Sequence, residues 1–193
     1  MNISSEYKIR KITPDKLDDF LQFFDTTAFA DNKEWEQCYC VFWHHPGTVD
    51  EWMKFSKEDN RKTAIQLIQN QKLSGFIAYE NERPIAFCNA NQKELFTFNK
   101  TRVEIAESKD TSVVSIVCFI VAHTHRRMGV ASSLLRAVSA HYKNTDIRLI
   151  EAYPAKTAEK DAQHYYGPLS LYLKNGFSII REYDHYYIVQ KRI

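Results

Sequence analysis

The stretch FIVAHTHRRMGVASSLL, residues 119–135, places two histidines, two arginines and a glycine between an apolar run and a run with helical spacing. This pattern predicts a buried strand that turns directly into a helix. The first backbone N–H groups of a helix lack intrahelical partners, and the helix dipole adds partial positive charge at that end. Arg126 and Arg127 add two whole charges, and Gly129 and Ala131 are small enough for a ligand to approach the backbone. The junction therefore suits a phosphate or pyrophosphate group.

An ordinary strand-to-helix turn is the alternative interpretation, in which the glycine relieves backbone strain and the arginines are solvated. The chain has only five glycines, and one of them stands here, which favours a ligand site. The motifs G-x-x-x-x-G-K-[ST] and G-x-G-x-x-G are both absent from the sequence. A nucleotide-hydrolysing P-loop and a dinucleotide-binding turn are therefore not expected.

The elements that must position this junction follow from apolar spacing and turn residues. Residues 7–12 alternate as an edge strand does, and Thr13 with Pro14 predicts the start of a helix. The remaining expected elements come in this order: a short helix from Thr48, a helix over 56–71, hairpin strands over 76–79 and 85–89, a buried strand over 113–122, a helix from Gly129, a strand over 147–153, a short helix over 169–175 and two closing strands. Residues 92–110 fit either a ragged strand or a long loop, and residues 156–166 fit a loop.

The overall composition is that of an ordinary globular chain. Its 193 residues are 44% hydrophobic and 26% charged, which predicts a single domain over residues 1–193. The formal net charge of +2 gives no strong attraction to nucleic acid or to an anionic membrane, so neither partner is expected. The N-terminus lacks the apolar core of a signal peptide, and the longest apolar run, residues 113–122, is too short to span a bilayer. We expect a soluble, cytoplasmic protein, and the oligomeric state stays open.

Two motifs together resemble those of a known family. RRMGVA, residues 126–131, fits [QR]-x-x-G-x-[GA], the pyrophosphate-binding signature of the GNAT superfamily of acyl-CoA N-acyltransferases. LYLKNGF, residues 171–177, resembles the L-Y-x-K-x-G-F of the same family, in the right order and beside the expected strands. The resemblance covers roughly residues 75–193, and the first third fits only by its strand-then-helices order. It implies an α/β fold with a mixed, mostly antiparallel central sheet flanked by helices and with splayed fourth and fifth strands.

The resemblance implies a site for acetyl-CoA between the splayed strands. The pantetheine arm is expected beside Phe119, Ile120 and Val121. The pyrophosphate is expected on the amides of the junction, which are those of Arg126, Arg127, Met128, Gly129, Val130, Ala131 and Ser132. The implied reaction is direct attack of a neutral primary amine, on a small molecule or a peptide, on the thioester in a ternary complex. Tyr172 matches the tyrosine that protonates the departing sulfur, although its apolar neighbours also fit a core tyrosine.

Two positions depart from the family pattern. Many members use a glutamate on the fourth strand as a base, but VVSIVCFIVA contains no carboxylate. Glu151, at the end of the strand IRLIEAY, is the first candidate, His123 and Glu104 come next, and a water relay is the alternative. The family's N-x-x-A-x-x-L-Y has Tyr165 and Pro168 at its asparagine and alanine here, which puts one cofactor contact in doubt.

A cluster of soft ligands and a run of aromatic residues lie in the first third of the chain. The four possible zinc ligands are Cys38, Cys40, His44 and His45. A C-x-C pair followed by adjacent histidines closes a tetrahedral site poorly, so no metal is expected and the cysteines are interpreted as buried free thiols. The aromatic residues Trp35, Tyr39, Phe42 and Trp43, with EAYP at 151–154, line an acceptor pocket or pack in the core. A non-catalytic acyl-CoA sensor and a zinc-stabilised interaction module are the alternatives to an enzyme.

Overall fold

The computed structural model describes residues 7–97, 112–157 and 161–193, and a seven-stranded sheet with the order β1-β2-β3-β4-β5-β7-β6 runs through them. Neighbouring strands are antiparallel except β4 and β5, which are parallel. The strands are β1 (Lys8–Lys11), β2 (Gly75–Glu80), β3 (Arg83–Gln92), β4 (Val113–Val121), β5 (Leu149–Ala152), β6 (Ser178–Glu182) and β7 (Tyr187–Arg192). The predicted mixed, mostly antiparallel sheet is confirmed.

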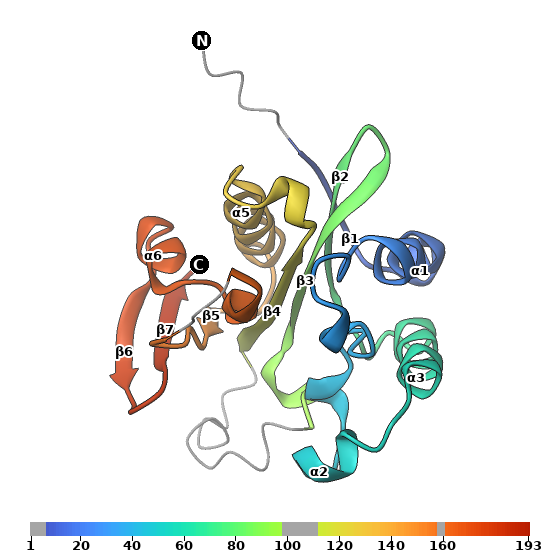
Figure 1. Cartoon of the computed structure of the whole chain (residues 1–193). Helices are drawn as coiled ribbons and strands as arrows, with labels where there is room; N and C mark the ends of the chain where they lie inside the picture. The colour runs from blue at the N-terminus through green and yellow to red at the C-terminus, as the bar shows by residue number, and fades with distance from the viewer. Residues whose placement is uncertain (1–6, 98–111, 158–160) are drawn as a thin grey trace.

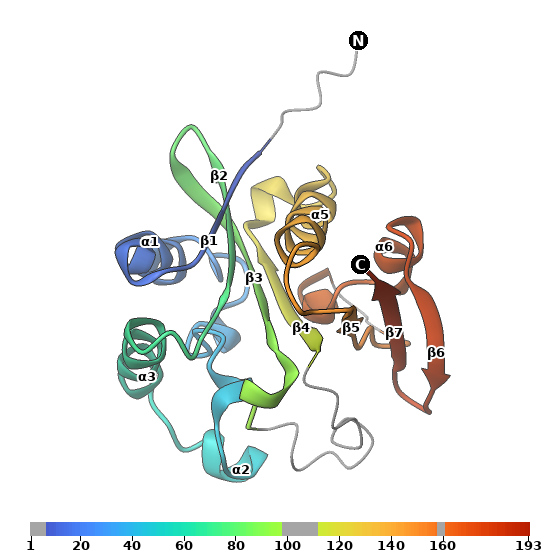
Figure 2. The ribbon, with the colours of Figure 1, turned by 180° about the vertical axis from the view of Figure 1, so that it is seen from behind.

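Helices cover both faces of this sheet (Figures 1 and 2). The α-helices are α1 (Leu17–Thr26), α2 (Val49–Trp52), α3 (Lys57–Gln69), α5 (Val130–Tyr142) and α6 (Leu169–Lys174). Short 3-10 helices are η1 (Pro14–Lys16), η2 (Lys33–Trp35), η3 (Phe42–His44), η4 (Lys93–Leu95), η6 (His123–His125) and η7 (Asp161–Tyr166). None of the helices in the described ranges has the length and apolar content that crossing a membrane requires.

The sheet separates two apolar cores. One contains Phe20 and Phe24 of α1 and Ile68 of α3, and the other contains Leu134 of α5 and Tyr172 of α6. Figure 1 shows the same division, with α1 and α3 on one side of the strands and α5 on the other. Alternate residues of the strands enter opposite cores, so each central strand is buried on both faces.

Local sequence signals explain most helix starts. Thr48 and Ser56 accept hydrogen bonds from the backbone N–H groups of Glu51 and Asp59, and both pairs form the reciprocal capping box. Thr13 differs from the expectation, because its hydroxyl donates to the Asp15 carboxylate over 2.6 Å and caps no backbone group. The segment predicted as a loop over 156–166 contains η7, and the ambiguous segment over 92–110 begins with η4 and continues outside the described residues.

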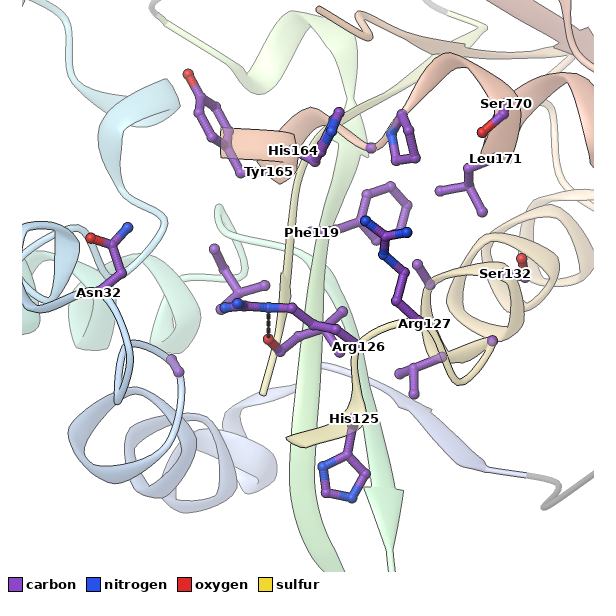
Figure 3. A pocket seen from close by; sticks show the side chains of 18 of the residues that line it. Asn32, Phe119, His125, Arg126, Arg127, Ser132, His164, Tyr165, Ser170 and Leu171 are labelled. Carbon is purple, nitrogen blue, oxygen red and sulfur yellow. Dashed lines mark hydrogen bonds between the residues drawn. The ribbon is translucent and has the colours of Figure 1, made fainter. Parts of the chain in front are cut away.

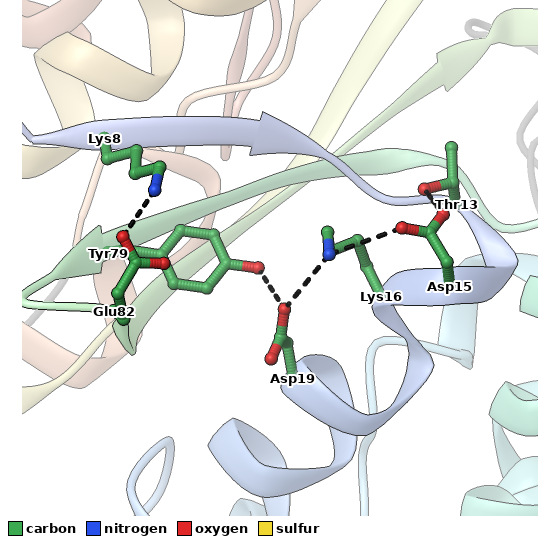
Figure 4. A network of polar contacts seen from close by, with 7 residues as sticks. All are labelled: Lys8, Thr13, Asp15, Lys16, Asp19, Tyr79 and Glu82. Atoms are coloured by element: carbon green, nitrogen blue, oxygen red, sulfur yellow. Dashed lines mark hydrogen bonds and ion pairs between the residues drawn. The ribbon is translucent and has the colours of Figure 1, made fainter.

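A polar network holds α1 against the edge of the sheet (Figure 4). The Tyr79 hydroxyl of β2 donates to the Asp19 carboxylate of α1 over 2.7 Å, and the Lys16 ammonium lies 3.9 Å from the same carboxylate. Burial, together with this carboxylate, raises the pKa of Tyr79 above its ordinary value. Lys8 and Glu82 form an ion pair between β1 and the β2–β3 turn. The network thus fixes α1, which leads into the segment between α1 and η2.

A β-bulge interrupts β4 in its centre. Two consecutive residues of β3, Asn89 and Ala90, face Cys118 and Ile116, so Val117 is an extra residue on β4. An extra residue bends the strand and shifts its alternation by one. Val117 and Cys118 accordingly enter the same core, the one on the α1 side.

The bulge coincides with the point where β4 and β5 separate. The parallel pairing runs from Val113 opposite Leu149 to Ile116 opposite Ala152, where β5 ends. Residues 118–121 of β4 keep their antiparallel pairing with β3, but β5 offers no partner to residues 117–121. The splayed strands expected from the resemblance are therefore present, and they leave an open edge on β4.

Candidate functional site

A cavity of about 580 Å³ lies along the open edge of β4. Its walls come from four parts of the chain: the end of β4, the start of α5, the η7–α6 segment and the segment between α1 and η2 (Figure 3). Cavities of this size hold small molecules and cofactors. The separation of β4 from β5 is what gives the cavity access to strand backbone.

Almost all the residues predicted to contact the cofactor line this cavity. They are Phe119, Ile120, Val121, Arg126, Arg127, Gly129, Val130, Ala131 and Ser132. Met128 is the exception, because its side chain is 56% exposed and does not line the cavity. Two helix-start positions that sequence reasoning doubted, Tyr165 and Pro168, also line it. The junction and residues of the second motif, Leu171 and Lys174, thus line the same cavity.

The start of α5 is open toward this cavity. Gly129 is the N-cap, with φ of 84°, and no side chain caps the first turn. A Cβ atom added at Gly129 would meet nothing within 4 Å, so the glycine is required by its left-handed backbone and the space beside it is free. Arg127 also has a positive φ, of 63°. Uncapped N–H groups beside two left-handed residues form a concave, partly positive surface that favours an anion.

Arg126 does not bring a free charge to the cavity, contrary to the expectation of two whole charges. Its Nη1 and Nη2 atoms donate to the Asp31 carboxylate over 2.5 and 3.0 Å, and its Nε donates to the Val121 carbonyl over 3.3 Å. The guanidinium holds the pKa of Asp31 below its usual value. Arg126 therefore joins the end of β4 to the segment between α1 and η2.

Arg127 and His125 complete the basic side of the cavity. Figure 3 shows Arg127 extending from the junction toward the η7–α6 side, while His125 points the other way. His125 is held by Glu80, at 3.1 Å from Nε2, and by Thr124, at 2.8 Å from Nδ1. Arg127 is thus the basic side chain of the junction that extends across the cavity.

Tyr172, the predicted acid, is fully buried in α6. Its hydroxyl donates to the Tyr166 carbonyl over 2.5 Å, and its ring lies 6.4 Å from that of Phe119. Burial raises the pKa of Tyr172 well above its ordinary value, which keeps the hydroxyl protonated. The side chain does not line the cavity, but a Cβ at the neighbouring Gly167 would lie 3.1 Å from its oxygen. Gly167, which lines the cavity, thus lies directly beside the Tyr172 hydroxyl.

Glu151, the first candidate base, is not the exposed strand-end residue that was expected. It lies inside β5 with 3% of its surface exposed. Its Oε1 accepts from the Lys93 ammonium over 2.8 Å and from the Tyr153 hydroxyl over 2.5 Å, and its Oε2 accepts from Gln190 over 2.7 Å. It does not line the cavity along β4. A long-range partner, Lys93, explains the burial, and spacing within the strand carried no signal of it.

Neither of the other two candidate bases is placed in the cavity wall by the part of the chain that the structure describes. His123 is exposed in η6 and does not line the cavity. Glu104 lies outside the described residues. The described part of the chain therefore brings no predicted base to the cavity wall.

A second cavity of about 390 Å³ adjoins the first. Phe29, Trp35, Ile120 and Tyr165 line both, so the two meet at β4. Of the aromatic residues interpreted as either pocket or core, Trp35, Phe42 and Trp43 line this cavity, whereas Tyr39 and Tyr153 are buried in the core. Trp52, Met53 and Cys118 line it too, and sequence reasoning missed them. Trp52 is the last residue of α2, whose start is marked in the sequence by the capping box at Thr48. The closeness of this short helix to the aromatic run was the sequence signal that could have identified Trp52.

The cysteines and histidines of the proposed zinc alternative are dispersed. Cys40 lies 3.5 Å from Cys118, sulfur to sulfur, and the cysteines are free. His44 packs on Phe96 and His45 on Phe55, each with ring centroids 5.1 Å apart. In the ranges that the structure describes, no three His, Cys, Asp or Glu side chains are grouped to hold a metal ion.

The comparisons with known proteins agree with this geometry. Residues 11–169 match the model of the Acetyltransferase (GNAT) family. The chain belongs to this family. The match ends before Tyr172, so the GNAT motif at 171–177 is supported by sequence resemblance and by the position of α6, not by the family model.

Solved structures show the same GNAT fold at low sequence identity. The PaiA N-acetyltransferase from Thermoplasma acidophilum, in complex with coenzyme A, is 15% identical with a TM-score of 0.56, over 97% of this chain and 99% of that one. The GNAT domain of S. lividans PAT is 14% identical with a TM-score of 0.59, over 97% and 90%. An N-acetyltransferase from Staphylococcus aureus Mu50 is 16% identical with a TM-score of 0.53, over 98% of each chain. Comparison with curated proteins gives no significant match.

Proposed function

We propose that this GNAT protein transfers an acetyl group from acetyl-CoA to a primary amine by direct attack in a ternary complex. One observation carries the proposal: the open edge of β4 and the uncapped start of α5 line the same cavity. Family membership supports acetyl transfer in general. The structural neighbour crystallised with coenzyme A supports a coenzyme A thioester as the donor. The cytoplasmic location stays a prediction from the sequence.

The residues present fit such a donor. The N–H groups after Gly129 and the Arg127 guanidinium suit the pyrophosphate, because they offer donors and positive charge with no carboxylate capping the helix. The open β4 edge from residue 117 to 121 offers backbone groups to the amides of a pantetheine arm. The free space at Gly129 lets a phosphate oxygen approach the backbone. These residues bind and orient the donor.

In the proposed reaction the amine nitrogen attacks the thioester carbonyl. A C–N bond forms, the C–S bond breaks, the nitrogen loses a proton and the sulfur gains one. Tyr172 is the proposed acid, since its raised pKa keeps the hydroxyl protonated and the hydroxyl lies beside Gly167, which lines the cavity. To protonate the sulfur, the hydroxyl must give up its hydrogen bond to the Tyr166 carbonyl.

Glu151 remains the proposed base only through an indirect path for the proton. Its carboxylate contacts the Tyr153 hydroxyl, which also contacts Ser115 of β4 over 2.9 Å. A proton from the amine would have to travel through water or through this chain of hydroxyls to reach it. A water relay without a single base fits the same geometry.

Binding and CoA release test the proposal separately. Acetyl-CoA should raise the melting temperature of the protein, and Ellman detection of free CoA should show release that depends on an added amine. Binding without release for every amine in a broad panel supports a non-catalytic sensor and contradicts the enzyme. Absence of both binding and release contradicts the acetyl-CoA site itself.

A further inference from the structure

We propose that the second cavity is the acceptor site and that it selects a primary monoamine with an aromatic or other apolar body. This inference rests on the proposed function, because it names the substrate class of the same site. The cavity reaches β4 at Ile120, where it meets the cavity assigned to the donor. An amine held in it can therefore bring its nitrogen to the place where the two cavities join.

The walls of the second cavity are mostly aromatic and already ordered. The Phe42 ring packs edge-to-face on Trp52, with centroids 5.1 Å apart, and on Trp43, with centroids 5.8 Å apart. Trp35 makes a similar contact with Tyr165 at 5.2 Å. Edge-to-face contacts fix the orientation of each ring. The cavity is therefore preformed, and it presents apolar surface to the body of a ligand.

The charges around the cavity exclude two common classes of amine. Among the residues that line it, Glu34 alone is charged, and it is exposed at the mouth. An amino acid would bury its carboxylate without a cation, and a polyamine would bring several ammonium groups to one carboxylate. A monoamine has neither problem. The volume of about 390 Å³ lies near the lower end of the range for ligand pockets, which favours a small molecule.

The three cysteines of the wall are compatible with this assignment. Cys38, Cys40 and Cys118 line the cavity. Burial raises the pKa of Cys38 to about 12 and that of Cys40 well above its usual value. Cys38 and Cys40 therefore stay thiols, so they add apolar surface and do not compete with the amine for the thioester.

The same apolar walls help to prepare the nucleophile. Burial in apolar surroundings disfavours an ammonium ion, so it lowers the pKa of a bound amine and raises the neutral fraction. This effect is useful in a chain whose β4 carries no carboxylate and whose Glu151 is engaged with Lys93. The cavity thus provides part of what a dedicated base would supply.

Three related amines test the substrate class. At saturating acetyl-CoA, phenethylamine should have a kcat/KM roughly tenfold or more above those of phenylalanine, which adds a carboxylate, and of spermidine, which adds positive charges. Faster transfer to spermidine, to phenylalanine or to a peptide with an N-terminal phenylalanine overturns this inference alone. No CoA release with any amine overturns the proposed function as well. Octanoyl-CoA is a further probe of the second cavity. If octanoyl-CoA is a better donor than acetyl-CoA, the second cavity holds the acyl chain and the inference is overturned.

A variant at the rim changes selectivity without touching the core. Met53 lines the cavity and is 58% exposed, so Met53→Glu should fold and should place a second carboxylate at the mouth. We expect the ratio of kcat/KM for spermidine to that for phenethylamine to rise at least about fivefold. Val49→Glu is the matched control, since Val49 is 49% exposed at the start of α2, the helix that Met53 follows, and does not line the cavity. An equal change in both variants, or in neither, overturns the assignment.

Discussion

The guanidinium of Arg126 is paired with the carboxylate of Asp31 through two nitrogen–oxygen contacts of 2.5 and 3.0 Å. Asp31 belongs to the segment between α1 and η2, whose Phe29 and Asn32 line the donor cavity. The pair therefore connects the strand end of the junction to the opposite wall. It also distinguishes the two arginines, because Arg126 is committed to the wall, whereas Arg127 lines the donor cavity and is proposed as the anion contact.

The first prediction concerns Arg127. We expect Arg127→Gln to weaken acetyl-CoA binding about fivefold to thirtyfold, because a charge-assisted contact with the pyrophosphate is lost. Arg136→Gln, an equal charge change at an exposed α5 position outside the cavity, is the control and should leave the Kd unchanged. Isothermal titration measures both, and equal effects of the two variants would remove Arg127 from the site.

Gly129 offers a second test with a close control. Gly129 and Gly176 have φ values of 84° and 83°, and an added Cβ would have room at both. Each alanine variant should lower the free energy of unfolding by about 1–2 kcal/mol, the cost of a left-handed residue with a side chain. Urea unfolding measures this cost. Acetyl-CoA titration should then separate them, since only Gly129→Ala places a methyl group where the pyrophosphate is proposed to lie, and equal Kd values would contradict the proposal.

The Tyr172 hydroxyl provides a third prediction. Tyr172→Phe removes the proposed acid and the hydrogen bond to Tyr166, so the rate of CoA release should fall while the Kd for acetyl-CoA stays nearly constant. The lost hydrogen bond should cost about 1 kcal/mol of stability. Single-turnover kinetics at a temperature well below the melting point isolates the chemical step. An unchanged rate would show that Tyr172 is a core residue only.

Because Glu151 and Lys93 form a buried ion pair, a substitution of Glu151 changes the free energy of unfolding whether or not Glu151 is the base. Glu151→Gln leaves the Lys93 ammonium, which is 8% exposed, without its counter-charge. We expect a loss of about 3–5 kcal/mol in the free energy of unfolding, and a smaller loss when Lys93→Met is added. Urea unfolding of the single and double variants measures the coupling. If the folded double variant keeps the wild-type rate of CoA release, Glu151 is not the base.

The partly enclosed His44 predicts how stability depends on pH. Burial lowers the pKa of His44 from 6.5 to about 4, and its Nε2 has no hydrogen-bond partner in the described structure. The unfolded chain therefore binds a proton at His44 more readily than the folded chain does. The contribution of neutral His44 to the free energy of unfolding is complete above pH 6.5 and decreases as the pH falls toward 4. The loss should reach about 2–3 kcal/mol, and His44→Leu should remove it. The test is to measure the unfolding midpoints of two variants between pH 7 and about 4.5. The variants are His44→Leu and the exposed control His185→Leu, and equal pH profiles for both would contradict the role of His44.

The local features of the site were accessible from the sequence. The apolar run over residues 113–122, the glycine at 129 and the RRMGVA motif are contiguous, so strand, left-handed turn and helix start could be predicted together. The capping boxes at Thr48 and Ser56 are local in the same way, and the sequence predicts a helix from each of these residues.

The long-range features were not accessible. Arg126 meets Asp31 across 95 positions and Glu151 meets Lys93 across 58, and no spacing rule connects such pairs. The bulge at Val117 lies in a continuously apolar run, where the absence of alternation hides a shift between the two cores. The burial of Glu151 follows from these tertiary contacts, which is why the sequence placed it at an exposed edge.

The central claim is that acetyl-CoA lies with its pyrophosphate at the start of α5. Backbone amide chemical shifts in an NMR titration with acetyl-CoA test it most directly. The largest changes should fall on residues 127–132 and on 117–121 of the open β4 edge, while β6, at the far end of the sheet, stays unchanged. Saturation of the protein with no change at residues 127–132, and with changes concentrated elsewhere, would contradict the account.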